Sequence, residues 1–243
     1  MKNDWFASWF DTKYYHTLYK HRDEKEAKTF IGKLIENLKI PKGKKVLDLA
    51  CGKGRHSITL NELGYNVTGA DLSTNSIAIA SKSSKSGLNF IVHDMRKPIQ
   101  NTCFSAVFNL FTSFGYFDKE TDNIKVLESI HEMLEEKGLL IIDFMNISHA
   151  IKQLIPDDIK TLDGIEFKIS KKYDGKHIFK EIKFEDNGEY FHFTEKVQAL
   201  TLEIFENLLS KTGFKILRTF GDIDLNPFDK INSDRLIIIA QKI

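Results

Sequence analysis

The 243-residue chain has few of the features that mark secreted, membrane-embedded or repetitive proteins. Its two cysteines, Cys51 and Cys103, fall in different contexts, which predicts reduced thiols and a cytoplasmic protein. No apolar run is long enough to span a bilayer, and the first residues lack the apolar core of a secretory signal. We therefore expect no membrane partner. Internal repeats, low-complexity tracts and flexible linkers are also absent.

Charge of one sign is lacking too. Lys+Arg 35 against Asp+Glu 34 leaves a formal net charge of +1, so there is no bulk attraction to nucleic acid. Lysines do gather between residues 165 and 185, but acidic residues alternate with them, which is typical of the wet face of a strand pair. Nucleic acid is therefore not an expected partner. No grouping of His, Cys, Asp or Glu has metal-ligand spacing, so we expect no metal.

The hydrophobic pattern alternates between strand-like and helix-like segments. A helical spacing covers 23–38 and ends before Pro41 and Gly43. Segments long enough for helices then separate five apolar runs, at Val46–Leu49, Tyr65–Ala70, Leu88–Val92, Ala106–Phe111 and Leu139–Phe144. This alternation predicts a parallel sheet with crossover helices.

The spacing of apolar residues changes between Gly164 and Val197. Apolar and polar residues alternate there with a period of two, and Asp174-Gly175 and Asn187-Gly188 supply turn residues. Such a pattern predicts an antiparallel meander, inserted so as to lie on the main sheet. A helix starting near Leu202 and strands at Phe214–Leu217 and Leu236–Ala240 then close the chain.

The most informative segment runs from Val46 to Arg55, where an apolar strand enters a glycine-rich turn that opens a helix. The next apolar run ends in Asp71. In an α/β sheet this combination forms a nucleoside pocket, because the glycines let a ligand approach the backbone and the carboxylate accepts from ribose hydroxyls. By themselves, the glycines are equally consistent with an ordinary turn.

The motifs resemble those of class I S-adenosylmethionine-dependent methyltransferases. The resemblance is carried by DLACGKGRH from Asp48 to His56, by Asp71, by His93-Asp94-Met95 and by NLFTSFGY from Asn109 to Tyr116. It covers roughly Lys45 to Ile243. The family usually has glycine where this chain has Ala50.

The resemblance implies a fold and a domain organisation. The fold is α/β, a seven-stranded Rossmann-like methyltransferase sheet with an antiparallel last strand and a small antiparallel β cap. Residues 1–40 would form an N-terminal helical lid segment, and 41–243 the methyltransferase domain, with the antiparallel insertion at about 160–198. The insertion and the final hairpin are similar to the small-molecule branch, such as glycine and aminosugar N-methyltransferases.

The resemblance also implies S-adenosyl-L-methionine as cofactor and a role for each motif. Asp48 suits the methionine ammonium, Asp71 the ribose hydroxyls and Asp94 the adenine amino group, although Asp94 also suits a helix N-cap. Leu72 and Met95 would pack against the two faces of the adenine ring. The expected cofactor-binding residues are Asp48, Ala50, Gly52, Gly54, Arg55, Asp71, Leu72, Asp94, Met95, Asn109 and Leu110.

The acceptor side is drawn from other segments. In related enzymes the N-terminal segment folds over the cofactor, which places Tyr14 and Tyr15 near the methyl group as positioning residues. The alternative is that the N-terminal aromatics pack on the domain or on a second subunit, so the protein is expected to be a monomer or a homodimer. The expected substrate-binding residues are Phe114, Tyr116, Asn146 and Arg235.

These observations predict transfer of a methyl group to a small-molecule acceptor, with nitrogen as the first choice because no dedicated base for a hydroxyl is evident. Three alternatives stay open: a methyltransferase acting on RNA or protein, a catalytically silent S-adenosylmethionine-binding protein, and a nicotinamide oxidoreductase. The last is disfavoured by Asp48, since a carboxylate beside a pyrophosphate is unfavourable.

Overall fold

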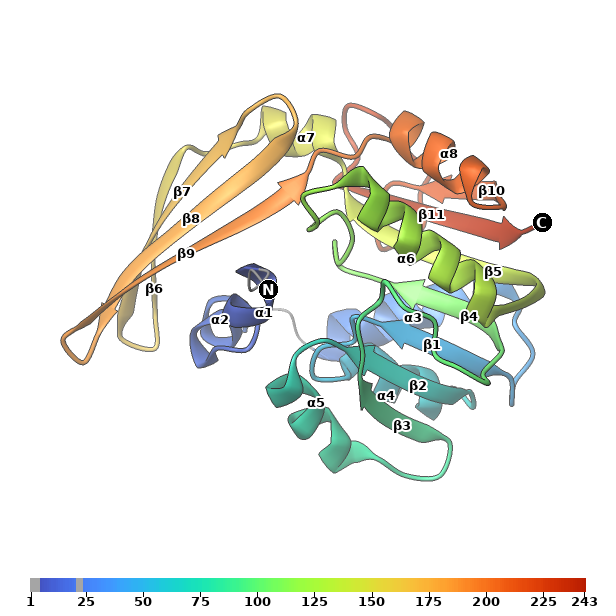
Figure 1. Ribbon diagram of the computed structural model, residues 1–243. Coiled ribbons are helices and arrows are strands. Elements are labelled where there is room, and N and C mark those ends of the chain that lie inside the picture. The colour runs from blue at the N-terminus through green and yellow to red at the C-terminus, as the bar shows by residue number, and fades with distance from the viewer. Residues whose placement is uncertain (1–4, 21–23) are drawn as a thin grey trace.

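A seven-stranded sheet forms the centre of the computed structural model, which describes residues 5–20 and 24–243 (Figure 1). In spatial order its strands are β10 (Phe214–Phe220), β11 (Arg235–Lys242), β5 (Leu134–Met145), β4 (Phe104–Asn109), β1 (Lys45–Leu49), β2 (Asn66–Asp71) and β3 (Leu88–Val92). The five strands from β1 to β5 run parallel, whereas β11 is antiparallel to both of its neighbours. The predicted fold class is confirmed, including the antiparallel last strand.

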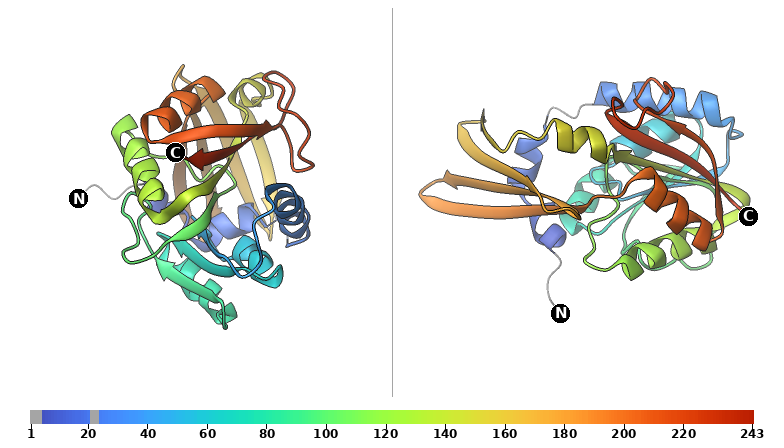
Figure 2. Two further views of the ribbon diagram at one scale, coloured as in Figure 1. Left: turned by 90° about the vertical axis from the view of Figure 1, so that its right-hand side faces the viewer. Right: turned by 90° about the horizontal axis from the view of Figure 1, so that it is seen from above.

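Helices cover both faces of this sheet (Figure 2). They are α3 (Glu24–Leu38), α4 (Arg55–Glu62), α5 (Thr74–Ala80), α6 (Glu120–Met133), α7 (Ile147–Lys152) and α8 (Leu202–Lys211), with a 3₁₀ turn at Ser81–Ser83. Because strand side chains alternate between faces, Val46 packs in one cluster with α3 and α4, whereas Leu47 and Leu49 pack in the other with α6 and α8. Burial on both faces explains why Val46, Leu47 and Leu49 of β1 are all apolar although they point to opposite sides. The Asp23 start predicted for α3 lies outside the described residues.

A second, four-stranded antiparallel sheet extends away from the first (Figure 1). Its strands are β6 (Asp157–Leu162), β7 (Ile165–Tyr173), β8 (His177–Asp186) and β9 (Glu189–Gln198), paired in sequence order. The predicted β cap is confirmed, with one strand more at its start. β6 was missed because this edge strand is polar and mostly exposed, so it has no clear apolar alternation.

The N-terminal helices α1 (Trp5–Trp9) and α2 (Lys13–Leu18) cover the inner face of the four-stranded sheet. Trp9 stacks on Phe193 with ring centroids 4.4 Å apart, and Tyr14 lies 4.5 Å from Phe184. The insertion was expected to lie on the main sheet. Most of its apolar face packs on α1 and α2 instead, and Val197 at the end of β9 joins the core cluster of the seven-stranded sheet. Both helices lie between the cap and the carboxyl ends of the central strands (Figure 1).

Candidate active site

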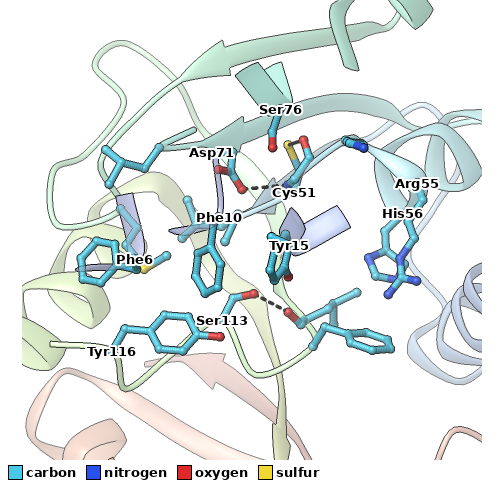
Figure 3. Close-up of a pocket in the computed structure, with 18 of the residues that line it drawn as sticks. Phe6, Phe10, Tyr15, Cys51, Arg55, His56, Asp71, Ser76, Ser113 and Tyr116 are labelled. Atoms are coloured by element: carbon cyan, nitrogen blue, oxygen red, sulfur yellow. Dashed lines mark hydrogen bonds between the residues drawn. The ribbon is translucent and has the colours of Figure 1, made fainter. Parts of the chain in front are cut away.

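A cavity of about 580 Å³ lies at the carboxyl ends of β1, β2 and β4, with α1 and α2 as its outer wall (Figure 3). Parallel strands end at one edge of a sheet, so the residues that follow them meet there. Ten of the sequence-predicted site residues line this cavity: Ala50, Gly52, Arg55, Asp71, Leu72, Asp94, Met95, Leu110, Tyr15 and Tyr116. Seven do not line it: Asp48, Gly54, Asn109, Phe114, Asn146, Arg235 and Tyr14.

The turn between β1 and α4 brings bare backbone to the cavity. Gly52 has a positive φ of 55°, and a Cβ added to it would meet no atom within 4 Å. A ligand can therefore approach this peptide closely. Gly54 serves packing instead, since a Cβ there would lie 2.6 Å from the ring of Phe90. Ala50 adopts a φ of 64° at the position where glycine is the usual residue of the motif.

Two carboxylates flank this turn, Asp71 half-buried and Asp48 fully buried. Asp71 accepts the Gly52 N–H on Oδ2 and the Ser73 N–H on Oδ1, both at 2.8 Å. Burial nonetheless raises the pKa of Asp71. Asp48 lies behind the turn, where it accepts the Ser57 hydroxyl at 2.5 Å and burial raises its pKa to about 6. Asp71 thus both shapes the turn and faces the cavity, with lone pairs left for a ligand.

The loops after β2 and β3 present one occupied carboxylate, Asp94, and two apolar side chains, Leu72 after β2 and Met95 after β3. Asp94 binds Arg96 through both carboxylate oxygens, with Nη2 to Oδ2 at 2.7 Å. Although burial favours the neutral acid, the hydrogen bonds from Arg96 hold the pKa of Asp94 below its ordinary value. Leu72 and Met95 line the same cavity.

The segment after β4 forms another part of the cavity wall. Asn109 is fully buried and donates from Nδ2 to the carbonyl of Leu49 at 3.1 Å, which ties β4 to β1. Leu110 lines the cavity, whereas Phe114 is buried in the core, with its ring 5.7 Å from that of Phe205. Between them, Phe111 lines the cavity with a positive φ.

The two predicted tyrosines of α2 point in different directions. Tyr15 lines the cavity, and its ring lies 4.8 Å from that of Phe10, which in turn lies 5.4 Å from Tyr116 (Figure 3). Tyr14 is instead buried against the cap, where its hydroxyl donates to Asp186 at 2.9 Å. Consecutive residues on a helix are about 100° apart, so Tyr14 and Tyr15 point to different surroundings, and here only Tyr15 reaches the cavity.

Polar contacts fasten α1 and α2 over the cavity. Asp11 accepts the Ser73 hydroxyl at 2.5 Å and the Asn75 side-chain amide at 2.7 Å, which joins the N-terminal segment to the start of α5. On the other side, Trp9 Nε1 donates to Glu195 at 2.7 Å and the Tyr19 hydroxyl donates to the same carboxylate at 2.8 Å. The segment bridges the central sheet and the cap.

Asn146 and Arg235 lie near the correct edge of the sheet, but other groups hold their side chains. Asn146 caps α7 and donates from Nδ2 to the carbonyl of Ser233 at 2.7 Å, beside a separate, smaller cavity. Arg235 forms a bidentate ion pair with Asp143. Both residues organise the sheet edge from outside the main cavity.

Three histidines, His16, His56 and His93, line the cavity although sequence reasoning did not assign them to the site. Burial lowers the pKa of His16 to about 4 and that of His56 to about 3, so both imidazoles are neutral at neutral pH. The signal available in the sequence was adjacency, because His16 follows Tyr15 and His56 follows Arg55. Within the described ranges, no three side chains of His, Cys, Asp or Glu come together as a metal site, and no helix is long and apolar enough to cross a membrane.

Comparison with known proteins agrees with this geometry. Residues 40–188 match the family model described as a methyltransferase domain. The chain belongs to this methyltransferase family. The Bacillus subtilis (strain 168) protein YqeM, which is named as a methyltransferase, is 31% identical over 84% of this chain and 86% of its own length. The predicted resemblance to class I S-adenosylmethionine-dependent methyltransferases is confirmed.

Another relative of this methyltransferase is named for its substrates, and a solved structure superposes on most of the chain. The glycine/sarcosine N-methyltransferase of Aphanothece halophytica is 29% identical over 86% of this chain and 80% of its own. An S-adenosylmethionine-dependent methyltransferase from Clostridium acetobutylicum ATCC 824 superposes with a TM-score of 0.78 at 21% identity, covering 94% of this chain and 96% of that one. The methyltransferase therefore shares its whole fold, cap included, with that structure.

Proposed function

We propose that this methyltransferase transfers a methyl group from S-adenosylmethionine to the nitrogen of a small-molecule amine. The observation that carries the proposal is the cavity itself, in which the open backbone of Gly52 lies beside the acceptor oxygens of Asp71. The named acceptor of a relative, glycine or sarcosine, is a small amine, which supports the same substrate class.

The residues present fit the cofactor. The space beside Gly52 is free of any atom that a Cβ would meet, so the methionine portion has room against the turn. Asp71 offers carboxylate lone pairs to the ribose hydroxyls, and Leu72 and Met95 offer apolar surface to the adenine. When bound, S-adenosylmethionine supplies an electrophilic methyl group on a positively charged sulfur.

The chain's own contribution is positioning and exclusion of water. Phe6 of α1, Phe10 of the turn that follows it, Tyr15 of α2 and Tyr116 of the loop after β4 form an aromatic wall of the cavity. Aromatic faces attract cations, so such a wall suits a positively charged centre and shields it from solvent. Holding the acceptor lone pair in line with the methyl group is the main requirement of this displacement.

Acid–base groups of the cavity favour nitrogen over oxygen as the acceptor atom. His16 and His56, with pKa values of about 4 and about 3, are too weakly basic to retain a hydroxyl proton. His93 contacts the carbonyl of Lys97 through Nε2 at 2.7 Å, so that nitrogen serves as a donor.

The carboxylates that line the cavity are engaged as well. Asp71 holds two backbone N–H groups and is assigned to the ribose hydroxyls with its remaining lone pairs, and Asp94 holds Arg96. A neutral amine needs no base in order to attack, because it carries a free lone pair, whereas a hydroxyl of high pKa must lose its proton. The cavity is therefore better suited to an amine.

An acceptor screen with matched pairs tests the proposal. The protein is incubated with S-adenosylmethionine and with glycine, sarcosine or an amino sugar, each paired with its hydroxyl counterpart, and release of S-adenosylhomocysteine is measured. We expect turnover with amines, at a rate that rises with pH as the amine loses its proton. Methylation of the hydroxyl partners alone would overturn the choice of nitrogen.

A further inference from the structure

Two consecutive residues beside the cavity hold the backbone in a left-handed conformation. Phe111 has a φ of 63° and Thr112 a φ of 56°. Neither is glycine, and Thr112 is β-branched, so this conformation is uncommon and costs free energy. It persists only where surrounding groups hold it. The groups that hold it lie on the neighbouring strand β5.

Asp143 of β5 clamps the two peptides. Its Oδ2 accepts the Phe111 N–H at 2.9 Å, and its backbone carbonyl accepts the Thr112 N–H at 2.8 Å. The Thr112 hydroxyl in turn accepts the N–H of Met145 at 3.0 Å. The left-handed pair is thus tied to β5 at three points, of which one depends on the orientation of a buried carboxylate.

Arg235 fixes that carboxylate. In the β5–β11 register Arg235 faces Met145 and Ile237 faces Asp143, which places the guanidinium diagonally beside the carboxylate on one face. Its Nε donates to Oδ1 at 2.7 Å and its Nη2 donates to Oδ2. The side chain of Asp143 is fully buried, so its charge requires this partner.

The ring of Phe111 connects this pair to the cavity. The guanidinium carbon of Arg235 lies 4.5 Å from the Phe111 ring centroid, and that of Arg55 lies 4.3 Å from it. Arg55 lines the cavity at the start of α4, whereas Arg235 does not line it. Phe111 therefore contacts both an arginine that faces the ligand site and one that does not.

We propose that Arg235 and Asp143 are positioning residues for the cofactor half of the site. They hold Phe111 in its left-handed conformation, and the Phe111 ring orients the guanidinium of Arg55 at the cavity. The inference rests on the proposed function, since it takes S-adenosylmethionine as the ligand. Arg235 acts on the ligand through Phe111 rather than by contact.

A double-mutant cycle separates this role from a purely structural one. Arg235→Lys, Phe111→Leu and the double variant are titrated with S-adenosylhomocysteine by calorimetry, at a temperature where circular dichroism shows each to be folded. Lysine keeps the charge but loses the two-pronged contact with Asp143. We expect each single variant to bind about tenfold more weakly and the double variant to lose little more, because both changes interrupt one connection. Arg218→Lys, an exposed arginine on β10, is the matched control and should bind as the wild type does.

Each result decides a separate question. Wild-type affinity in folded Arg235→Lys, or losses that multiply in the double variant, would overturn the positioning role. Phe111→Leu leaves the ion pair intact, so unchanged affinity there overturns the role even where Arg235→Lys fails to fold. A wild-type protein that does not bind S-adenosylhomocysteine would instead overturn the proposed function.

Discussion

Asp71 is the side chain whose removal has the most specific expected effect. Asp71→Ala should weaken binding of S-adenosylhomocysteine by about 1.5 to 3 kcal/mol, the scale for hydrogen bonds to a charged acceptor. At 25 °C this corresponds to about a 10- to 150-fold higher dissociation constant. The expectation follows from a half-buried carboxylate that lines the cavity and still has free lone pairs.

The same substitution also affects the fold, and the structure indicates by how much. It leaves the N–H groups of Gly52 and Ser73 without their carboxylate, at about 1 to 3 kcal/mol for each one that water cannot reach. Removing a carboxylate whose pKa is raised by burial offsets part of that loss. Thermal unfolding must therefore be measured beside calorimetric titration, and the affinity taken on folded protein only.

A matched control separates the two effects. Asp174 accepts the N–H groups of Lys176 at 2.8 Å and His177 at 2.7 Å in an exposed turn of the cap, so Asp174→Ala removes a similar pair of bonds away from the cavity. It should leave affinity unchanged. If folded Asp71→Ala bound S-adenosylhomocysteine as tightly as the wild type does, Asp71 would not be part of the ligand site.

Three further changes test other parts of the account. Gly52→Val should abolish binding of S-adenosylhomocysteine in calorimetry, in a folded protein, because the side chain fills the open space beside the turn. Gly164→Val, at a similarly open position with positive φ in the cap, is the control and should bind normally. Normal binding by Gly52→Val would show that the turn is not part of the site. Because the pKa of Asp48 is raised to about 6, its stabilising contribution is complete below about pH 4 and is lost as pH rises through about 6. The unfolding free energy of Asp48→Asn relative to wild type should therefore rise by on the order of 3 kcal/mol from about pH 4 to about pH 8. A difference between the two proteins that does not change with pH in chemical denaturation would show that the carboxylate titrates normally. Asp11→Ala removes the bonds from the N-terminal segment to α5 and should raise the dissociation rate of S-adenosylhomocysteine about fivefold in stopped-flow measurements; an unchanged rate would show that the segment does not cover the ligand.

The sequence was sufficient to predict the sheet and the strand ends, for a simple reason. Parallel strands buried on both faces are nearly continuous apolar runs, and the residues that follow them meet at one edge of the sheet. Asp71 ends a strand, Gly52 and Met95 each follow one, and all three line the cavity. Their meeting depends on strand direction, which the alternation of helices and strands had already predicted.

Side-chain direction was harder to predict. Tyr14 and Tyr15 are neighbours in one short helix, and only the packing of Tyr14 against Phe184 decides which of them faces the cavity. Arg235 precedes a strand at the correct edge, but it is held by Asp143, which lies 92 residues away in the sequence. Partners from distant segments determine orientation, and periodicity contains no information about them.

The measurement that tests the central claim most directly is isothermal titration of the wild-type protein with S-adenosylmethionine, S-adenosylhomocysteine and NAD in parallel. The account predicts micromolar binding of the two adenosyl compounds and no heat with NAD. Binding of NAD alone, or of none of the three, would contradict the assignment of this cavity to S-adenosylmethionine.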